Sequence, residues 1–237
     1  VPAFGDQNDD EEFGIFDRLG TKILGIGEFA GRRLLGSFKR NFGFGFSLVT
    51  FAFDKFASKI LKALADDLER YYTKQQFRTG VQDRLRRQLL AHRDREIMLV
   101  AHSMGSIVAY DVLTQLSSDE PVFRVARWIT IGSPLGLRFV KQRGEEHPQR
   151  MDVPKTPECV GAWSNMGDRR DPVALDIELA NDYVANSRGV ICSDEPVRND
   201  YAVADEKGDK RDENPHKSYG YLRTRQMAES IGSFVGA

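Results

Sequence analysis

Cysteine is scarce in this sequence, and long apolar runs are missing from it. The 237 residues include two cysteines, Cys159 and Cys192, whereas small secreted domains that depend on disulfides usually carry several bonded pairs. Each cysteine adjoins an apolar segment, which favours a small buried side chain in a reducing compartment. No apolar run reaches the roughly 20 residues that span a bilayer. The sequence therefore predicts a cytoplasmic protein without a disulfide framework.

Neither sign of charge is in excess, because 34 Lys and Arg face 35 Asp and Glu. Domains that bind nucleic acids usually carry a basic surplus or stripe, so we expect no nucleic-acid partner. The four histidines show no H-x-x-x-H spacing, so we also expect no metal site. The segment Gly25–Gly31 superficially resembles a dinucleotide-binding loop but lacks the required strand-turn-helix setting with a later acidic residue. No cofactor is expected.

The first 95 residues are rich in glycine and phenylalanine and have mainly helical patterns. Apolar residues recur at three- and four-residue steps between Ser47 and Tyr72, and a more polar helix is expected from Val81 to His92. We interpret residues 1–95 as helices that cap or cover a sheet and residues 96–237 as the core, within one structural domain. Alternatively, the Phe-rich segment 42–64, with lysines on its polar side, contacts a membrane surface or lines an acyl pocket.

Beyond residue 96, short apolar runs alternate with helical patterns. The first run, Ile97–Ala101, is unbroken, as expected of a strand buried on both faces of a parallel sheet. Further strands are expected at Val125–Ile131, Val160–Asn165 and Gly189–Cys192, and helices at Ser106–Leu116, Pro172–Asn186 and Tyr221–Phe234. Strands that alternate with helices predict an α/β fold with a parallel sheet.

The sequence Ala101-His102-Ser103-Met104-Gly105 directly follows the first of these strands and precedes a helix. This is the setting of a nucleophile elbow, in which a sharp turn exposes a serine hydroxyl and needs small residues two positions before and after the serine. The backbone N–H of Met104 and the N-terminus of the helix would stabilise a developing negative charge. The alternative is a serine that only caps the helix.

A serine nucleophile needs a base, and the base needs a carboxylate that orients it. In proteins with this elbow the order along the chain is serine, acid, histidine, and two histidines follow Ser103, namely His147 and His216. His147 comes early, in a charged loop, so His216 is the predicted base. Asp171 and Asp168 both follow the third expected strand. We favour Asp171 as the acid and keep Asp168 as the alternative.

Four blocks of the sequence resemble the lipase/esterase-like α/β-hydrolases of bacteria, and they occur in the order found in that family. The blocks are Leu99–Leu113, Trp128–Gly136, Trp163–Ala174 and His216–Leu222. The resemblance implies an α/β-hydrolase-type parallel sheet flanked by helices and a serine esterase or lipase activity toward an ester or lipid. By position it implies Ser103 as nucleophile, Asp171 as acid and His216 as base.

The sequence departs from this family at its front. Such enzymes carry an early strand that ends in a His-Gly loop and supplies a second oxyanion donor, but no His-Gly precedes Ser103. Three explanations stay open: the chain is a fragment, a partner chain or N-terminal segment completes the sheet, or the protein is a non-catalytic binding or regulatory module. We favour an active serine hydrolase that cleaves a carboxylic ester, because a protein without activity has no physical need to retain all three triad residues. An amide or thioester substrate also stays open.

Overall fold

The computed structural model describes residues 55–137, 140, 154–204 and 211–236 of the chain. These residues all belong to the unit that runs from Phe53 to Ala237. Three features of the sequence lie outside the described residues: the loop Gly25–Gly31, most of the Phe-rich segment 42–64, and the charged loop around His147.

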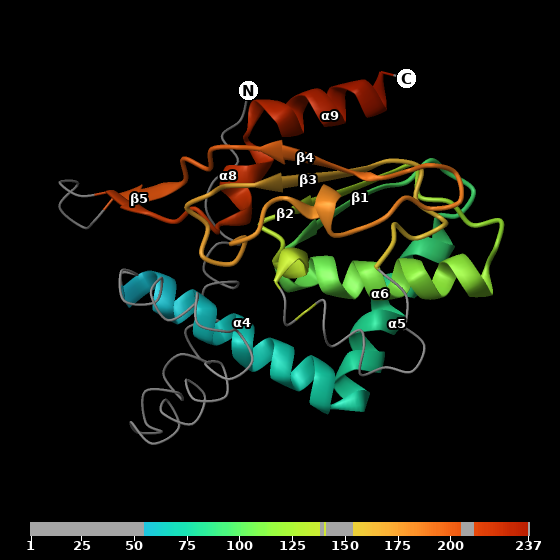
Figure 1. Ribbon diagram of the computed structural model, residues 1–237, viewed down its shortest axis with the longest axis horizontal. Helices are drawn as coiled ribbons and strands as arrows, with labels where there is room; N and C mark the ends of the chain where they lie inside the picture. Colours follow the sequence, from blue (N-terminus) through green and yellow to red (C-terminus); the bar gives the residue numbers. More distant parts are fainter. Residues whose placement is uncertain (1–54, 138–139, 141–153, 205–210, 237) are drawn as a thin grey trace. The chain divides into compact units, whose positions relative to one another are not determined.

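Four parallel strands, paired in the order β1-β2-β3-β4, form the sheet (Figure 1). The strands are β1 (Met98–His102), β2 (Arg127–Ile131), β3 (Trp163–Gly167) and β4 (Cys192–Pro196). Because all four run in the same direction, their carboxyl ends meet at one edge of the sheet, where ligands bind in open α/β sheets. The predicted α/β fold with a parallel sheet is confirmed.

Helices connect and flank these strands. They are α4 (Lys55–Thr73), α5 (Gln75–Ala91), α6 (Met104–Asp119), α8 (Ser218–Leu222) and α9 (Arg225–Val235), with 3₁₀ turns at Pro134–Gly136 and Leu179–Asn181. An antiparallel ribbon of β5 (Ala202–Ala204) and β6 (Arg211–Glu213) precedes α8. The helices α6 and α9 lie on opposite sides of the sheet (Figure 1). Within the described ranges, no helix combines the length and apolar character that crossing a bilayer requires.

Aromatic side chains form the core between the sheet and α6. Trp128 of β2 and Trp163 of β3 occupy paired positions, and their rings stack with centroids 4.4 Å apart. Tyr110 of α6 packs against Trp128 with centroids 6.3 Å apart, and Tyr183 meets Tyr110 edge-on at 5.4 Å. Aromatic pairs contribute roughly 0.5–1.5 kcal/mol each beyond the burial of their area. This layer therefore holds α6, and the Ser103 turn at its start, against the sheet.

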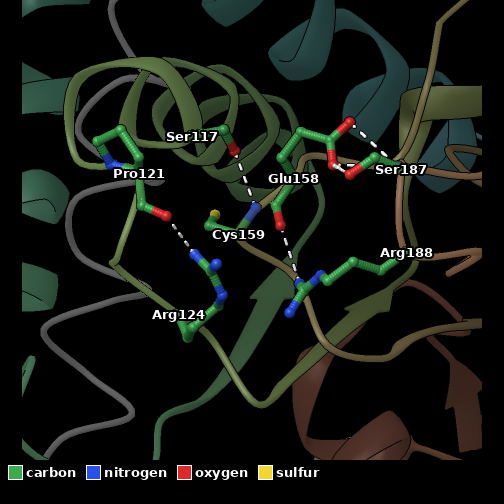
Figure 2. Close-up of a pocket in the computed structure, with 7 residues that line it drawn as sticks. All are labelled: Ser117, Pro121, Arg124, Glu158, Cys159, Ser187 and Arg188. Atoms are coloured by element: carbon green, nitrogen blue, oxygen red, sulfur yellow. Dashed lines mark hydrogen bonds between the residues drawn. The ribbon is translucent and has the colours of Figure 1, made fainter.

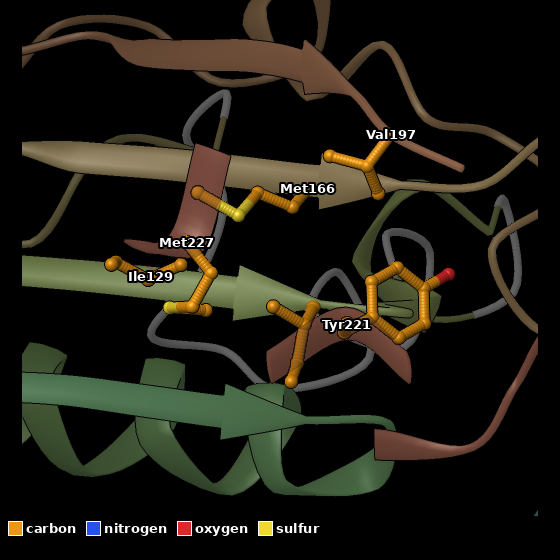
Figure 3. Close-up of a cluster of buried hydrophobic side chains, with 6 residues drawn as sticks. Ile129, Met166, Val197, Tyr221 and Met227 are labelled. Atoms are coloured by element: carbon orange, nitrogen blue, oxygen red, sulfur yellow. The ribbon is translucent and has the colours of Figure 1, made fainter. Parts of the chain in front are cut away.

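The opposite face of the sheet packs against α8 and α9. Figure 3 shows Ile129 and Met166 of the sheet beside Met227 of α9 and Tyr221 of α8. Successive side chains of a strand point to opposite faces, so Ile129 faces these helices while its neighbour Trp128 faces α6. Full burial of an Ile or Met side chain contributes roughly 1.5–3 kcal/mol. This cluster therefore anchors Tyr221 near the carboxyl ends of the strands.

The two helices before the sheet pack together with α6. Leu64, Leu68 and Tyr71 of α4 recur every three or four residues and are buried, as the helical periodicity predicts. The Tyr71 hydroxyl donates to Asp111 of α6 at 2.7 Å and accepts from Gln82 of α5 at 2.7 Å. A buried tyrosine usually finds such a polar partner, and this one joins three helices. Leu64, the last residue of the Phe-rich segment, thus packs in the core.

Two expectations about the later part of the chain are wrong. The helix expected at Pro172–Asn186 is instead a loop with one 3₁₀ turn, and the strand expected at Gly189–Cys192 lies further along, in β4. Hydrogen bonds to a distant strand replace those of the expected helix. The N–H groups of Leu179 and Ala180 donate to the Asp194 carboxylate of β4 at 2.9 Å each. A local apolar pattern cannot show partners of this kind.

Candidate active site

Ser103 stands at the turn between β1 and α6 in a strained backbone conformation. Its φ of 54° and ψ of −132° make it the one non-glycine residue with positive φ in the described part of the chain. Such a conformation costs about 1–3 kcal/mol and persists only where the surroundings impose it. The Ser103 N–H donates to the Ile131 carbonyl at 3.1 Å, and the buried Ser106 hydroxyl donates to the Ala101 carbonyl at 3.2 Å. The Ser103 hydroxyl makes no cap bond to α6, so the structure does not support a helix-capping role.

The other residues of the elbow have distinct environments. Ala101 is buried in β1, one residue before the strand ends, and Gly105 is exposed in the first turn of α6. A Cβ atom on Gly105 would meet no atom within 4 Å outside its own helix, so the structure gives no steric reason for glycine there. Met104 is the first residue of α6, where a helix leaves backbone N–H groups without a partner of its own. No described residue before β1 forms a strand of the kind expected to supply a second donor.

The structure brings Ser103, His216 and Asp171 into one line at the carboxyl edge of the sheet. His216 Nε2 lies 3.0 Å from Ser103 Oγ, and His216 Nδ1 lies 2.9 Å from both carboxylate oxygens of Asp171. A carboxylate only accepts hydrogen bonds, so Nδ1 carries the proton and Nε2 is left to accept from the serine hydroxyl. The three residues come from loops that follow β1, β6 and β3. This is the arrangement of a nucleophile, a base and a carboxylate that orients the base.

Asp171 is fully buried, and other donors besides His216 satisfy its carboxylate. The Tyr221 hydroxyl donates to Oδ2 at 2.7 Å, and the Val173 N–H donates to Oδ1 at 2.8 Å. The same Tyr221 oxygen accepts the Asp168 N–H at 3.1 Å, so it bridges two points of one loop. An isolated buried carboxylate would be costly, and these bonds replace the water that it lost. Tyr221 is not among the site residues predicted from the sequence. The apolar pattern around it indicates only which side of a helix is buried, not which side chain its hydroxyl contacts.

Gly132 leaves room for the carboxylate and the imidazole. It follows β2 with a φ of 53°, in the left-handed region that glycine enters most easily. A Cβ atom there would lie 2.7 Å from Asp171 Oδ2 and 3.4 Å from His216 Nδ1. The Gly132 N–H donates to the Met166 carbonyl at 3.1 Å, which ties the turn to β3. The block Trp128–Gly136 contains this glycine, but nothing in the sequence shows that it packs against the acid.

Asp168, the alternative candidate acid, has other partners. Arg170 binds its carboxylate through Nε at 3.2 Å and Nη2 at 2.8 Å, and the Asn199 N–H donates to it at 2.6 Å. Although burial opposes ionisation, the hydrogen bonds from Arg170 and Asn199 hold the pKa of Asp168 below its usual value. The geometry therefore favours Asp171 as the carboxylate that contacts His216. Asp168 instead binds Arg170 and the Asn199 N–H.

A separate hollow of about 250 Å³ lies at the opposite, amino-terminal edge of the strands (Figure 2). Its lining includes Arg124 before β2, Glu158 before β3, and Arg188 before β4. Figure 2 shows these groups bonded to the protein itself, since Arg188 donates to the Glu158 carbonyl at 2.8 Å and the Ser187 hydroxyl donates to the Glu158 carboxylate. These bonds tie the loops at this edge together. Among the described residues, no group of three or more His, Cys, Asp or Glu side chains is arranged to hold a metal ion.

The sequence is similar to part of a protein of Saccharomyces cerevisiae that is named a probable mitochondrial phospholipase. The two are 31% identical over 93 residues, which cover 36% of this chain and 13% of the yeast protein. No family model matches the sequence, and no solved structure matches it. The chain thus resembles a small part of a protein with a hydrolase name, which agrees in general terms with a lipase-like hydrolase.

Proposed function

We propose that this chain is a serine hydrolase that cleaves a carboxylic ester through an acyl-enzyme. Ser103 is the nucleophile, His216 the general base and acid, and Asp171 the carboxylate that orients the imidazole. The observation that carries the proposal is the hydrogen-bonded line from Ser103 Oγ through His216 to Asp171, with links of 3.0 and 2.9 Å. The same constellation recurs on unrelated folds in which serine is activated for acyl transfer. The strained backbone of Ser103 also supports it, because such strain clusters at functional sites.

Each half of the proposed reaction moves one proton through His216. Nε2 takes the hydroxyl proton as Ser103 Oγ attacks the ester carbonyl carbon, and Asp171 stabilises the imidazolium that forms. The oxyanion accepts a hydrogen bond from the Met104 N–H. The imidazolium then protonates the leaving oxygen as the carbon–oxygen bond breaks, which releases the alcohol and leaves an acyl-serine. Water, deprotonated by the same imidazole, then attacks the acyl carbon. The imidazolium returns this proton to Ser103 Oγ as the acyl carbon–oxygen bond breaks, which releases the carboxylic acid and regenerates the serine.

The substrate class is inferred from chemistry and similarity together. A triad of this geometry can also cleave amides and thioesters, so the geometry alone leaves the leaving group open. The similarity to a protein named a phospholipase favours a lipid with a carboxylic ester bond. Lipid esters are therefore the substrates to screen first.

Labelling with a fluorophosphonate probe tests the proposal, because such probes phosphonylate activated serines. We expect the wild-type chain to be labelled, Ser103→Ala to stay unlabelled, and Ser187→Ala to be labelled like wild type. Ser187 is an exposed serine at the other edge of the sheet, so it controls for unspecific reaction. Labelling that survives in Ser103→Ala would place the nucleophile elsewhere. An unlabelled wild-type chain would favour a non-catalytic binding or regulatory module with the same fold.

A further inference from the structure

Three consecutive backbone carbonyls around the proposed base accept hydrogen bonds from two side chains. Asn199 Nδ2 donates to the carbonyls of Pro215 at 2.8 Å and of Lys217 at 2.9 Å. Between them, the carbonyl of His216 itself accepts from His102 Nε2 at 2.7 Å. The side chains of His102 and Asn199 are together termed the carbonyl clamp.

His102 can fill this place only as a hydrogen-bond donor. A carbonyl oxygen only accepts, so His102 Nε2 carries a proton. Burial and the neighbouring His216 lower the pKa of His102 to about 4, so its ring is neutral near pH 7. The ring packs against the His216 ring with centroids 4.7 Å apart. A neutral neighbour places no charge against the imidazolium that His216 forms in the proposed reaction.

Asn199 is held in place from the opposite side. The residue is 1% exposed, and its backbone N–H donates to Asp168 at 2.6 Å. Arg170, which pairs with Asp168, also donates to the Asn199 carbonyl at 2.8 Å. A Cβ atom on Gly220 would overlap the Asn199 amide, so α8 leaves space for this side chain. The clamp thus links the loop of the acid to the loop of the base.

We propose that the carbonyl clamp holds the imidazole of His216 in line with Ser103 and Asp171, which makes His102 and Asn199 positioning residues. This inference rests on the serine hydrolase function proposed above. Because three of its carbonyls are hydrogen-bonded, the backbone around His216 has few other conformations available. The conformation of this backbone sets the direction in which the imidazole points. Misplacement of a catalytic group by about 1 Å can cost on the order of 100-fold in rate. The clamp acts through His216 and touches no reacting atom.

The chain contains a matched control for Asn199 at the other edge of the sheet. Asn186 is also buried, and its Nδ2 donates to two carbonyls, those of Pro157 at 3.2 Å and Val160 at 3.1 Å. Its Oδ1 accepts from backbone N–H groups, as that of Asn199 does. Replacing either asparagine by aspartate keeps the shape of the side chain, removes both N–H donors and adds the same acidic group at both buried sites. The two replacements should therefore cost similar stability, whereas only one of them frees carbonyls beside the base.

The test compares Asn199→Asp with Asn186→Asp in the full chain, with p-nitrophenyl butyrate as substrate and a fluorophosphonate as probe. We expect Asn199→Asp to lower kcat and the labelling rate about 100-fold with little change in KM, and Asn186→Asp to stay close to wild type. At His102, leucine removes the donor and glutamine keeps one, so His102→Gln should recover most of the activity that His102→Leu loses. Equal losses in the two asparagine variants, or no rescue by glutamine, would overturn the proposal.

A second readout separates failure of the clamp from failure of the hydrolase proposal. The Nδ1 proton of His216, held by the buried Asp171, should give a far-downfield proton resonance that His216→Ala removes. We expect Asn199→Asp to shift or broaden this resonance and Asn186→Asp to leave it unchanged, whether or not the chain hydrolyses esters. A chain that shows this pattern but resists labelling would support the clamp and contradict the hydrolase proposal. An Asn199→Asp variant that keeps both the resonance and the rate would overturn the clamp.

Discussion

Asp171 presents both of its carboxylate oxygens to one nitrogen of His216, each at a distance of 2.9 Å. The carboxylate is fully buried, and 12% of the imidazole side chain is exposed. A charge-assisted hydrogen bond is about twice as strong as a neutral one, and this one decides which ring nitrogen carries the proton. Activity in the proposed mechanism therefore depends on the orientation of the base as well as on its presence.

Replacing Asp171 by asparagine should reverse the tautomer of the base. The asparagine amide can donate to His216 Nδ1, which places the ring proton on Nε2 and leaves no acceptor for the proton of Ser103. We expect kcat/KM for ester hydrolysis to fall about 10⁴-fold with the fold retained, as in other triads trapped in the wrong tautomer.

The control for this variant is Asp176→Asn. Asp176, like Asp171, accepts the backbone N–H two residues later, but it does so in an exposed turn. Its replacement should leave the rate of hydrolysis at the wild-type value. Wild-type rates in Asp171→Asn would show that this carboxylate does not orient the base.

Removing the Tyr221 hydroxyl should weaken the fold and the site together. The hydroxyl accepts from the Asp168 N–H and donates to Asp171, so Tyr221→Phe leaves two buried polar groups short of a partner. We expect the free energy of unfolding, measured by urea titration, to fall by about 1–3 kcal/mol. Tyr183→Phe, which loses the hydrogen bond that the hydroxyl donates to the Leu135 carbonyl, should cost about 1 kcal/mol. A Tyr221→Phe variant as stable as wild type would mean that the bridge contributes nothing.

Adding a methyl group at Gly132 should displace the acid from the base. The new Cβ would lie 2.7 Å from Asp171 Oδ2, and the left-handed backbone costs an alanine about 1–2 kcal/mol. We expect Gly132→Ala to lower both kcat and the free energy of unfolding, because the carboxylate has to move.

Gly80→Ala is the control for this change. Gly80 is exposed within α5, and a Cβ atom there meets nothing within 4 Å. The substitution should therefore raise the free energy of unfolding by about 0.5–1 kcal/mol. A Gly132→Ala variant with wild-type rate and stability would contradict the close packing of Gly132 against the carboxylate.

The neutral imidazole of His102 should make the folded state sensitive to acid. The ordinary pKa of the group is 6.5, whereas burial and the neighbouring His216 lower its pKa in the folded chain to about 4. Between these two pH values the unfolded state binds more protons, so the free energy of unfolding falls as the pH falls. The loss is small at pH 7 and reaches about 2 kcal/mol at pH 5.

Urea titrations at pH 7 and pH 5 measure this loss. We expect His102→Gln, which keeps a donor but cannot take up a proton, to lose about 2 kcal/mol less than wild type between the two pH values. Parallel losses in the variant and the wild-type chain would show that His102 titrates in the folded chain as it does in the unfolded one.

The strand-turn-helix setting of Ser103 could be predicted from the sequence because all of its determinants are local. A strand, a sharp turn and a helix follow one another within a few residues of Ser103, and the structure places them at Met98–His102 and Met104–Asp119. Chain order then pointed to His216 as the base and left Asp171 and Asp168 as the two candidate acids. Their catalytic roles stay a proposal.

The supports of the site could not be predicted in the same way. Tyr221 and Asp171 are 50 residues apart, and His102 and the carbonyl of His216 are 114 residues apart. The loop at Pro172–Asn186 has an apolar pattern that suits a helix, yet partners on β4 hold it in another shape. Long-range hydrogen bonds of this kind leave no periodic trace in the sequence.

The sequence by itself determined the parallel α/β architecture and the strand-turn-helix setting of Ser103, because periodicity and turn chemistry act over a few neighbouring residues. Only the tertiary structure decided that Asp171 rather than Asp168 meets the base, that Gly132 leaves room for it, and that the carbonyl clamp surrounds it. These outcomes depend on which side chains reach the same point from separate loops, and that is settled when the sheet and helices pack.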